Sequence, residues 1–304
     1  MALVTGGAGL LGSHLGRALP AGGFLPHLTT HRTRASVAGC RSVQLDLTDR
    51  RAVEEVVAAI APKVVIHTAA ITDVDYCQTH PKEARQVNVR GTRYLARAAA
   101  GVGAFLIYVS TDYVFDGRRG GYRETDYPSP GNWYGLTKLA GELAAATCLP
   151  GADLAIVRTT FYGLRVDGRG FFNRCLATLT AGQGLDAAVD LISSPLPVTV
   201  LARALTELAG KRLGGIHHIA GAQRCSRYEF ALAVARVHGL DASLVRPESR
   251  GAASLPGPRP RDVSLCVCRA QERLRVPLPT LVKGLEELSV DGSVIMEGLG
   301  DGSR

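Results

Sequence analysis

The 304-residue sequence has no uninterrupted apolar run of the roughly 18 residues that a membrane-spanning helix requires. It also lacks a start in which charged residues precede an apolar segment, which is the pattern of a secretory signal. Its 7 cysteines are scattered and odd in number, which argues against a disulfide framework. We therefore expect a soluble protein of the cytoplasm that contacts no membrane.

A cluster of metal ligands is missing as well. Cys266 and Cys268 are separated by one residue, a spacing that can bind a metal ion, but no second ligand cluster accompanies them. Their alternation with apolar neighbours predicts a strand in which both pack. His217 and His218 stand between isoleucines and are likewise expected in a strand. We predict no metal site.

Runs of basic residues are absent, although the net charge is +8. The arginines stand singly, and aromatic residues make up only 6% of the chain. The mixture of basic and aromatic residues that is typical of a nucleic-acid surface is therefore missing, and we expect no nucleic-acid partner. A general positive field would instead attract polyanionic small molecules, such as a dinucleotide or a nucleotide diphosphate.

Lysine is scarce, with 5 residues against 30 arginines, yet Lys138 follows Tyr134 by 4 positions. In a helix, the ammonium would lie one turn from the phenol, where it favours the phenolate and lowers the tyrosine pKa. A free tyrosine has a pKa of about 10 and is nearly inert as an acid or base at neutral pH. The pair therefore predicts a tyrosine that is tuned for proton transfer.

Three glycines follow the first predicted strand, residues 1–5. Gly6, Gly9 and Gly12 open an amphipathic stretch that reaches about residue 19. At this spacing the first glycine permits a tight turn, the second lets the backbone approach a pyrophosphate, and the third allows the helix to pack closely on the strand. The free N–H groups of the helix start also favour phosphates. A dinucleotide site is predicted, and a glycine-rich loop without a ligand is the alternative.

The end of the second predicted strand, residues 24–30, indicates which dinucleotide is preferred. An acidic residue there would bind the ribose 2′-OH of NAD, but the sequence has Thr30, His31 and Arg32. Arg32, helped by Thr30 or His31, suits the 2′-phosphate of NADP(H), which we therefore favour over NAD(H). The alternative is that Arg32 and Arg34 are solvated loop charges.

Strand-like and helix-like segments alternate along the chain. Strands are predicted at residues 42–45, 64–69, 105–110 and 154–159, and helices at residues 50–61, 81–100 and 133–147. This alternation indicates an α/β fold with a doubly wound, Rossmann-type parallel sheet. We expect residues 1–162 to form the dinucleotide-binding domain. Residues 163–290 are expected to form mainly a smaller substrate-binding lobe, with some segments returning to the first domain, and residues 291–304 a disordered tail.

Two predicted strands end in residues that suit chemistry at the carboxyl edge of a parallel sheet. Ala69 and Ala70 follow one strand, and their small side chains would let the backbone approach a cofactor. Thr111 follows another and would present a hydroxyl to a bound carbonyl. An ordinary tight turn and a capping hydroxyl are the alternatives.

Together these features resemble the extended short-chain dehydrogenase/reductase superfamily, and more narrowly the dTDP-4-dehydrorhamnose reductase family. The resemblance covers about the first 165 residues and returns at residues 259–265. It rests on the segments TGGAGLLG (5–12), LDLTD (45–49), AAITDVD (69–75), NVRGT (88–92), STDYVF (110–115), ETD (124–126), YGLTKLAGE (134–142) and RPRDVSL (259–265).

The resemblance implies a role for each matching residue. Tyr134 would protonate the carbonyl oxygen of the substrate. Lys138 would lower the pKa of Tyr134 and hold the nicotinamide ribose, and Thr111 would donate a hydrogen bond to the reacting oxygen. Asn88 would anchor a water relay behind the lysine. The implied cofactor contacts are Gly6, Gly9, Leu11 and Gly12 at the pyrophosphate, Asp46 and Leu47 at the adenine, and Ala69 and Ala70 beside the ribose. The implied sugar contacts are Thr72, Val74, Asp112 and Tyr113.

Two positions depart from the family pattern. Phe161 stands where a substrate-facing tryptophan is usual, and Cys266 stands where an aspartate is frequent.

We predict an NADPH-dependent reductase of the 4-keto group of a dTDP-4-keto-6-deoxyhexose or similar nucleotide sugar, in deoxysugar biosynthesis. The alternatives are an epimerase or dehydratase of the same superfamily and a noncatalytic NADP-binding regulatory subunit resembling the β subunit of methionine adenosyltransferase. A homodimer is left open.

Overall fold

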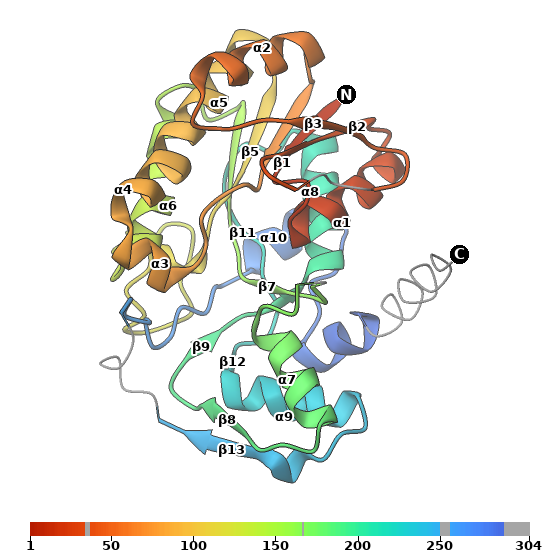
Figure 1. Ribbon diagram of the computed structural model, residues 1–304, viewed down its shortest axis with the longest axis vertical. Helices are drawn as coiled ribbons and strands as arrows, with labels where there is room; N and C mark the ends of the chain where they lie inside the picture. Colours follow the sequence, from red (N-terminus) through yellow and green to blue (C-terminus); the bar gives the residue numbers. More distant parts are fainter. Residues whose placement is uncertain (34–36, 166, 250–255, 289–304) are drawn as a thin grey trace.

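The computed structural model describes residues 1–33, 37–165, 167–249 and 256–288 (Figure 1). A seven-stranded sheet lies at its centre, in the order β11-β6-β5-β4-β1-β2-β3, with all neighbours parallel. The strands are β1 (Ala2–Thr5), β2 (Pro26–Thr30), β3 (Arg41–Gln44), β4 (Val64–His67), β5 (Phe105–Val109), β6 (Leu154–Arg158) and β11 (Gly215–His218). The order reverses between β1 and β4, so the predicted doubly wound Rossmann-type fold is confirmed.

Helices cover both faces of the sheet. Successive strand residues point to opposite sides, so the apolar side chains of each strand need cover on both faces. In β1, Ala2 and Val4 join a buried cluster with side chains of α1 (Leu10–Ala18) and α8 (Val198–Lys211). Leu3 joins a second cluster with side chains of α2 (Arg50–Ile60), α5 (Thr92–Gly101) and α6 (Trp133–Ala146). The continuously apolar strands of the sequence are thus buried on both faces, as a parallel sheet requires.

The second lobe lies beyond the carboxyl edge of the sheet (Figure 1). Its elements are α7 (Phe171–Thr180), α9 (Arg227–Val237), and three strand pairs, β7 (Phe161–Tyr162) with β10 (Leu196–Pro197), β8 (Leu185–Ala188) with β13 (Val245–Glu248), and β9 (Ile192–Ser193) with β12 (Cys225–Ser226). Phe172, Leu179 and Phe230 belong to its separate hydrophobic cluster. Both α8 and β11 follow residue 162 in sequence, yet α8 packs on the central sheet and β11 is its edge strand beside β6. The boundary at residue 162 stays a prediction.

The helix expected over residues 81–100 is present and contains a π-helical segment. After α3 (Val74–Thr79), the chain forms α4 (Pro81–Arg85), then a π-helical segment η2 (Gln86–Gly91), then α5. Asn88 lies in η2, and its carbonyl accepts the hydroxyl of Thr92 at 2.7 Å. A π-helical turn holds one extra residue and often occurs at functional sites. Short 3-10 turns complete the structure at η1 (Leu19–Gly22), η3 (Asp112–Val114) and η4 (Ala242–Leu244).

The strand expected around Cys266 and Cys268 is wrong. Leu265 makes an isolated bridge to Tyr122, and Cys268 begins the helix α10 (Cys268–Arg273). Alternation over so few residues does not separate a strand from a helix start, and burial of Ala270 favours the helix. His217 and His218 lie in β11, as expected. Among the described helices, none is long and apolar enough to cross a bilayer.

Leu205→Ala tests the contribution of α8 to the fold. Leu205 is fully buried between α8 and the sheet, so removing its side chain leaves a cavity. We expect the free energy of unfolding in urea to fall by about 2–5 kcal/mol. Leu143→Ala on α6 is the control, because Leu143 is 62% exposed and should change stability by no more than about 0.5 kcal/mol. Equal losses in the two variants would contradict this packing.

Candidate active site

Two cavities lie at the carboxyl edge of the sheet, where the fold predicts ligands. The first cavity, of about 570 Å³, lies between the ends of β2 and β3 and the segments α3, α4 and η2. The second cavity, of about 510 Å³, lies between the ends of β5 and β6 and the second lobe. Most of the residues predicted from the sequence line one of the two cavities, whereas Gly9, Leu11, Gly12, Asn88 and Lys138 line neither.

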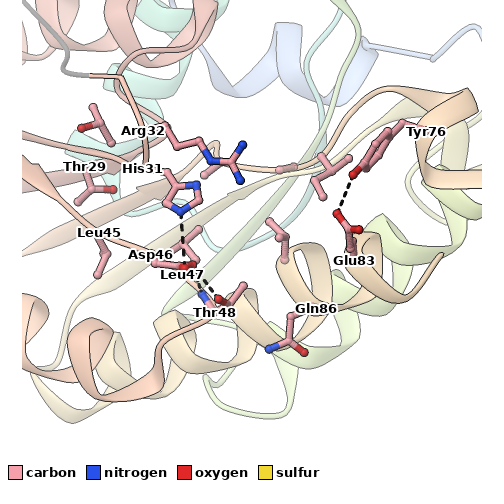
Figure 2. A pocket seen from close by; sticks show the side chains of 16 residues that line it. Thr29, His31, Arg32, Leu45, Asp46, Leu47, Thr48, Tyr76, Glu83 and Gln86 are labelled. Carbon is pink, nitrogen blue, oxygen red and sulfur yellow. Dashed lines mark hydrogen bonds and ion pairs between the residues drawn. The ribbon is translucent and has the colours of Figure 1, made fainter. Parts of the chain in front are cut away.

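Most of the predicted cofactor residues line the first cavity (Figure 2). They are Gly6, Thr30, His31, Arg32, Asp46, Leu47, Ala69 and Ala70. Figure 2 shows Arg32 extending from the end of β2 toward the wall that carries Tyr76 and Glu83, whose side chains are hydrogen-bonded at 2.7 Å. The chain thus places a cation over this cavity.

His31 and Asp46 form another polar contact in this cavity. Nε2 of His31 lies 3.6 Å from Oδ2 of Asp46. The backbone N–H of Thr48 donates to Asp46 at 2.8 Å, and this bond is the main reason that the pKa of Asp46 lies below its usual range. Asp46 is therefore an anion that caps the turn after β3 and faces the exposed imidazole.

The glycine turn has the geometry that its spacing predicts. Gly6 has a φ of +72°, which favours glycine, and a Cβ there would lie 3.0 Å from the backbone of Ala69. A Cβ at Gly12 would overlap the carbonyl of Gly6, so only glycine lets α1 approach β1 this closely. Gly9 donates its N–H to the Gly6 carbonyl at 2.9 Å, and Leu11 is buried in the first turn of α1. These four residues shape the turn beside the first cavity.

A buried hydrogen-bond chain joins β1 to η2 through His67. The hydroxyl of Thr92 donates to the Asn88 carbonyl, so it accepts a hydrogen bond from Nε2 of His67 at 3.0 Å. The hydroxyl of Thr5 accepts the N–H of Ala69 at 3.2 Å and donates to Nδ1 of His67 at 2.7 Å. Burial lowers the pKa of His67 to about 3, so the ring stays neutral in this tautomer.

Asn88 connects the loop after β4 to α6. Its side-chain amide accepts from the N–H of Ile71 at 2.8 Å and donates to the Ile71 carbonyl at 2.9 Å. It also donates to the hydroxyl of Thr137 at 3.0 Å, which in turn donates to the carbonyl of Tyr134 at 2.9 Å. The π-helical turn therefore brings a buried amide against the backbone of the tyrosine.

Helix α6 begins where a side chain caps it. Asn132 caps the helix by accepting the N–H of Gly135 at 2.8 Å, which fixes the helix start at Trp133. Tyr134 is then in the first turn and lines the second cavity, while Lys138 follows one turn later and is buried. The ammonium of Lys138 donates to the carbonyl of Val109 at 2.7 Å.

The pKa of Tyr134 shifts opposite to the direction expected from Lys138. Burial raises the tyrosine pKa and outweighs a hydrogen bond with Thr111, which lowers it. Burial also lowers the pKa of Lys138 to about 7. The main cause is the same for both groups, because loss of contact with water favours the neutral form of each.

The residues predicted to contact the sugar all line the second cavity. They are Thr72, Val74, Thr111, Asp112, Tyr113 and Phe161. Thr111 donates to Oδ1 of Asp112 at 3.0 Å, and burial raises the pKa of Asp112 to about 7. Among the described residues, none bonds to Oδ2 of Asp112. This carboxyl therefore offers a free polar atom at the cavity.

Sequence reasoning missed the arginines of the second cavity. Arg165, Arg227 and Arg259 line it, and Arg227 lies 4.9 Å above the ring of Phe171. Arg259 is held by Asp75 through two hydrogen bonds of 2.8 and 2.9 Å. Arg259 stands in the segment RPRDVSL (259–265), but no spacing along the chain indicates that it meets Arg165 and Arg227, because the three converge from segments far apart in the sequence. Their charges make the second cavity suited to an anionic ligand.

Comparison with known proteins gives consistent matches over most of the chain. The family model described as RmlD substrate binding domain matches residues 1–292. A dTDP-4-dehydrorhamnose reductase of Mycobacterium tuberculosis is 40% identical over 267 residues, which cover 86% of this chain and 82% of the relative. Methionine adenosyltransferase 2 subunit beta of Pongo abelii is 34% identical, over 86% of this chain and 79% of the relative.

A solved structure agrees with these matches. The crystal structure of dTDP-4-dehydrorhamnose reductase from Bacillus anthracis, in complex with NADP, superimposes with a TM-score of 0.84 at 29% identity, covering 95% of this chain and 98% of that chain. The family predicted from the sequence is confirmed: the chain belongs to the family of the RmlD substrate binding domain and the dTDP-4-dehydrorhamnose reductases.

Proposed function

We propose that this protein is an oxidoreductase that uses NADPH to reduce the 4-keto group of a dTDP-4-keto-6-deoxyhexose or similar nucleotide sugar, in deoxysugar biosynthesis. The observation that carries the proposal is the pairing of the Thr111 and Tyr134 side chains at the wall of the second cavity. Two hydroxyls at one point of a cavity can bind one carbonyl oxygen and deliver a proton to it. The 40% identity to a named reductase supports the same chemistry.

The first cavity fits a nicotinamide dinucleotide. A side chain at Gly6 would crowd the loop after β4, so the bare backbone leaves room for a pyrophosphate beside the start of α1, where Gly9, Leu11 and Gly12 lie. Arg32, with Thr30 and His31 beside it, would bind the 2′-phosphate that distinguishes NADPH from NADH. Asp46 and Leu47 would contact the adenine, and Ala69 and Ala70 the ribose.

When bound, the nicotinamide supplies the hydride. Tyr134 supplies the proton to the carbonyl oxygen, and burial suits it to this role because a raised pKa keeps the phenol protonated until transfer. Thr111 holds the same oxygen through its hydroxyl. Lys138, one helical turn away, stabilises the phenolate that remains after transfer. Asn88 positions Tyr134 through Thr137.

The second cavity would hold the nucleotide sugar. Thr72, Val74, Tyr113 and Phe161 would surround the sugar, and Asp112 would bond one of its hydroxyls through Oδ2. The cluster of arginines would bind the diphosphate, since guanidinium groups pair with phosphate oxygens.

A noncatalytic NADP-binding subunit is the second candidate. The specific observation in its favour is the 34% identity to a methionine adenosyltransferase subunit. Such a protein would bind the cofactor without turnover. The presence of Thr111, Tyr134 and Lys138 in one arrangement favours the reductase.

Tyr134→Phe tests the proton donor. The variant keeps the ring and loses only the hydroxyl, so it should bind NADPH normally. We expect kcat to fall by about 10²- to 10⁴-fold, the usual contribution of general acid catalysis. The measurement is the loss of absorbance of the reduced cofactor with a panel of dTDP-4-keto-6-deoxysugars, together with a direct NADPH-binding titration.

Leu143→Phe, on the exposed face of the same helix, is the matched control and should keep full turnover. Equal turnover by Tyr134→Phe and the wild type would eliminate the proposed proton donor. Tight NADPH binding by the wild type with no turnover on any sugar of the panel would favour the regulatory subunit.

Arg32→Ala tests the cofactor preference. Loss of a charge-assisted contact to the 2′-phosphate should raise the KM for NADPH by about 10- to 100-fold. The KM for NADH should change little, because NADH has no phosphate there. Arg41→Ala, at the opposite end of β3 and exposed, should leave both values unchanged. A wild type that prefers NADH, or a variant that keeps its preference for NADPH, would contradict the role of Arg32.

A further inference from the structure

A buried network of charged groups lies behind Tyr134, where α6 meets the ends of β5 and β6. Glu142 is one turn beyond Lys138 on α6, and both side chains are almost fully buried. The Glu142 carboxylate accepts hydrogen bonds from Oγ of Ser110 at 2.5 Å and from Nε and Nη2 of Arg158 at 3.1 and 2.8 Å. One face of α6 therefore carries Tyr134, Lys138 and Glu142 in succession.

The immediate contacts of Lys138 do little to keep its charge. Its ammonium donates to the carbonyl of Val109 and lies 4.1 Å from the centre of the Tyr108 ring. A carbonyl and an aromatic face are weak partners for a cation that has been removed from water. The titratable groups packed around it are His67 on β4, Tyr108 on β5, Arg158 on β6 and, on α6 itself, Tyr134 and Glu142.

Glu142 is the anion in this group. His67 is held neutral by burial, the two phenols are neutral because burial raises the pKa of each, and Arg158 is a cation. An ionised carboxylate one helical turn from an ammonium stabilises it.

We propose that Glu142 is a positioning residue of this site that keeps Lys138 in its ammonium form, and that Ser110 and Arg158 hold the carboxylate in place for this role. The inference rests on the proposed function, because the charge of Lys138 matters to catalysis only if Tyr134 transfers a proton.

The direction of the effect follows from the electrostatics. Burial lowers the pKa of Lys138 to about 7, and the charge of Glu142 opposes this shift. A lysine is charged below its pKa and neutral above it. Removing the charge of Glu142 therefore lowers the pKa of Lys138 further, so that the ammonium is lost at a lower pH. If activity needs the ammonium, the fall of kcat with rising pH moves to lower pH by the same amount.

Glu142→Gln is the variant that tests this proposal, since it keeps the size of the side chain and its bond to Ser110. The chain has only 5 lysines, so protein labelled with ¹³C at lysine Cε gives few signals, and Lys138→Met assigns the one of interest. We expect the Lys138 titration and the high-pH limb of kcat both to shift downward by about one pH unit in Glu142→Gln. A merely structural role would lower stability and leave both titrations where they are.

Glu207→Gln is the matched control. Glu207 pairs with Lys211 at 2.6 Å on α8, so this variant should change the Lys211 signal and leave the Lys138 titration unchanged. If Glu142→Gln fails to fold, the double variant Glu142→Gln/Arg158→Met removes the guanidinium that has lost its partner. A downward shift of the Lys138 titration is again expected, smaller than in the single variant because the loss of the positive charge of Arg158 offsets part of it.

An unchanged Lys138 titration in a folded variant would overturn the proposal. A shifted titration in a protein whose wild type reduces no sugar would support the electrostatic pairing and reject the proposed function instead. The two failures are therefore distinguishable.

Discussion

The close approach of α6 to the end of β5 is the constraint on which the rest of the site depends. Two glycines permit it. A Cβ at Gly135 would overlap a backbone carbonyl of η3, and a Cβ at Gly141 would overlap a buried phenol of β5. Because both positions lack a side chain, the helix brings Tyr134 to Thr111 and seats the ammonium of Lys138 against the end of the strand. A larger residue at either glycine would separate the groups that the proposed chemistry needs together.

The same packing sets the electrostatics of the site. Removing groups from water favours their neutral forms, so burial raises the pKa of Tyr134 and lowers those of Lys138 and His67. This suits a phenol that must carry its proton to the substrate, but it opposes a lysine that must stay charged. The spacing of the helix meets both requirements, because it places the carboxylate of Glu142 one turn beyond Lys138, where the negative charge stabilises the ammonium.

Much of the fold and the site could be predicted from local sequence. The turn at Gly6 and Gly12 is specified by residues within one segment, and so is the helical spacing of Tyr134 and Lys138. The π-helical segment within the helix over residues 81–100 could not be predicted, because it lies where the Asn88 amide bonds to the loop after β4, a contact that forms only in the folded chain. The arginines that line the second cavity were missed for a related reason, since they converge from separate segments of the chain.

The sequence by itself determined the alternation of strands and helices over about the first 160 residues, the glycine turn at the first cavity and the identity of the groups that can transfer a proton. These properties depend on side-chain type and on spacing along the chain, which are local. Tertiary structure decided the protonation state of those groups and which residues line the second cavity. Burial and the meeting of distant segments control both, and neither exists until the chain has folded.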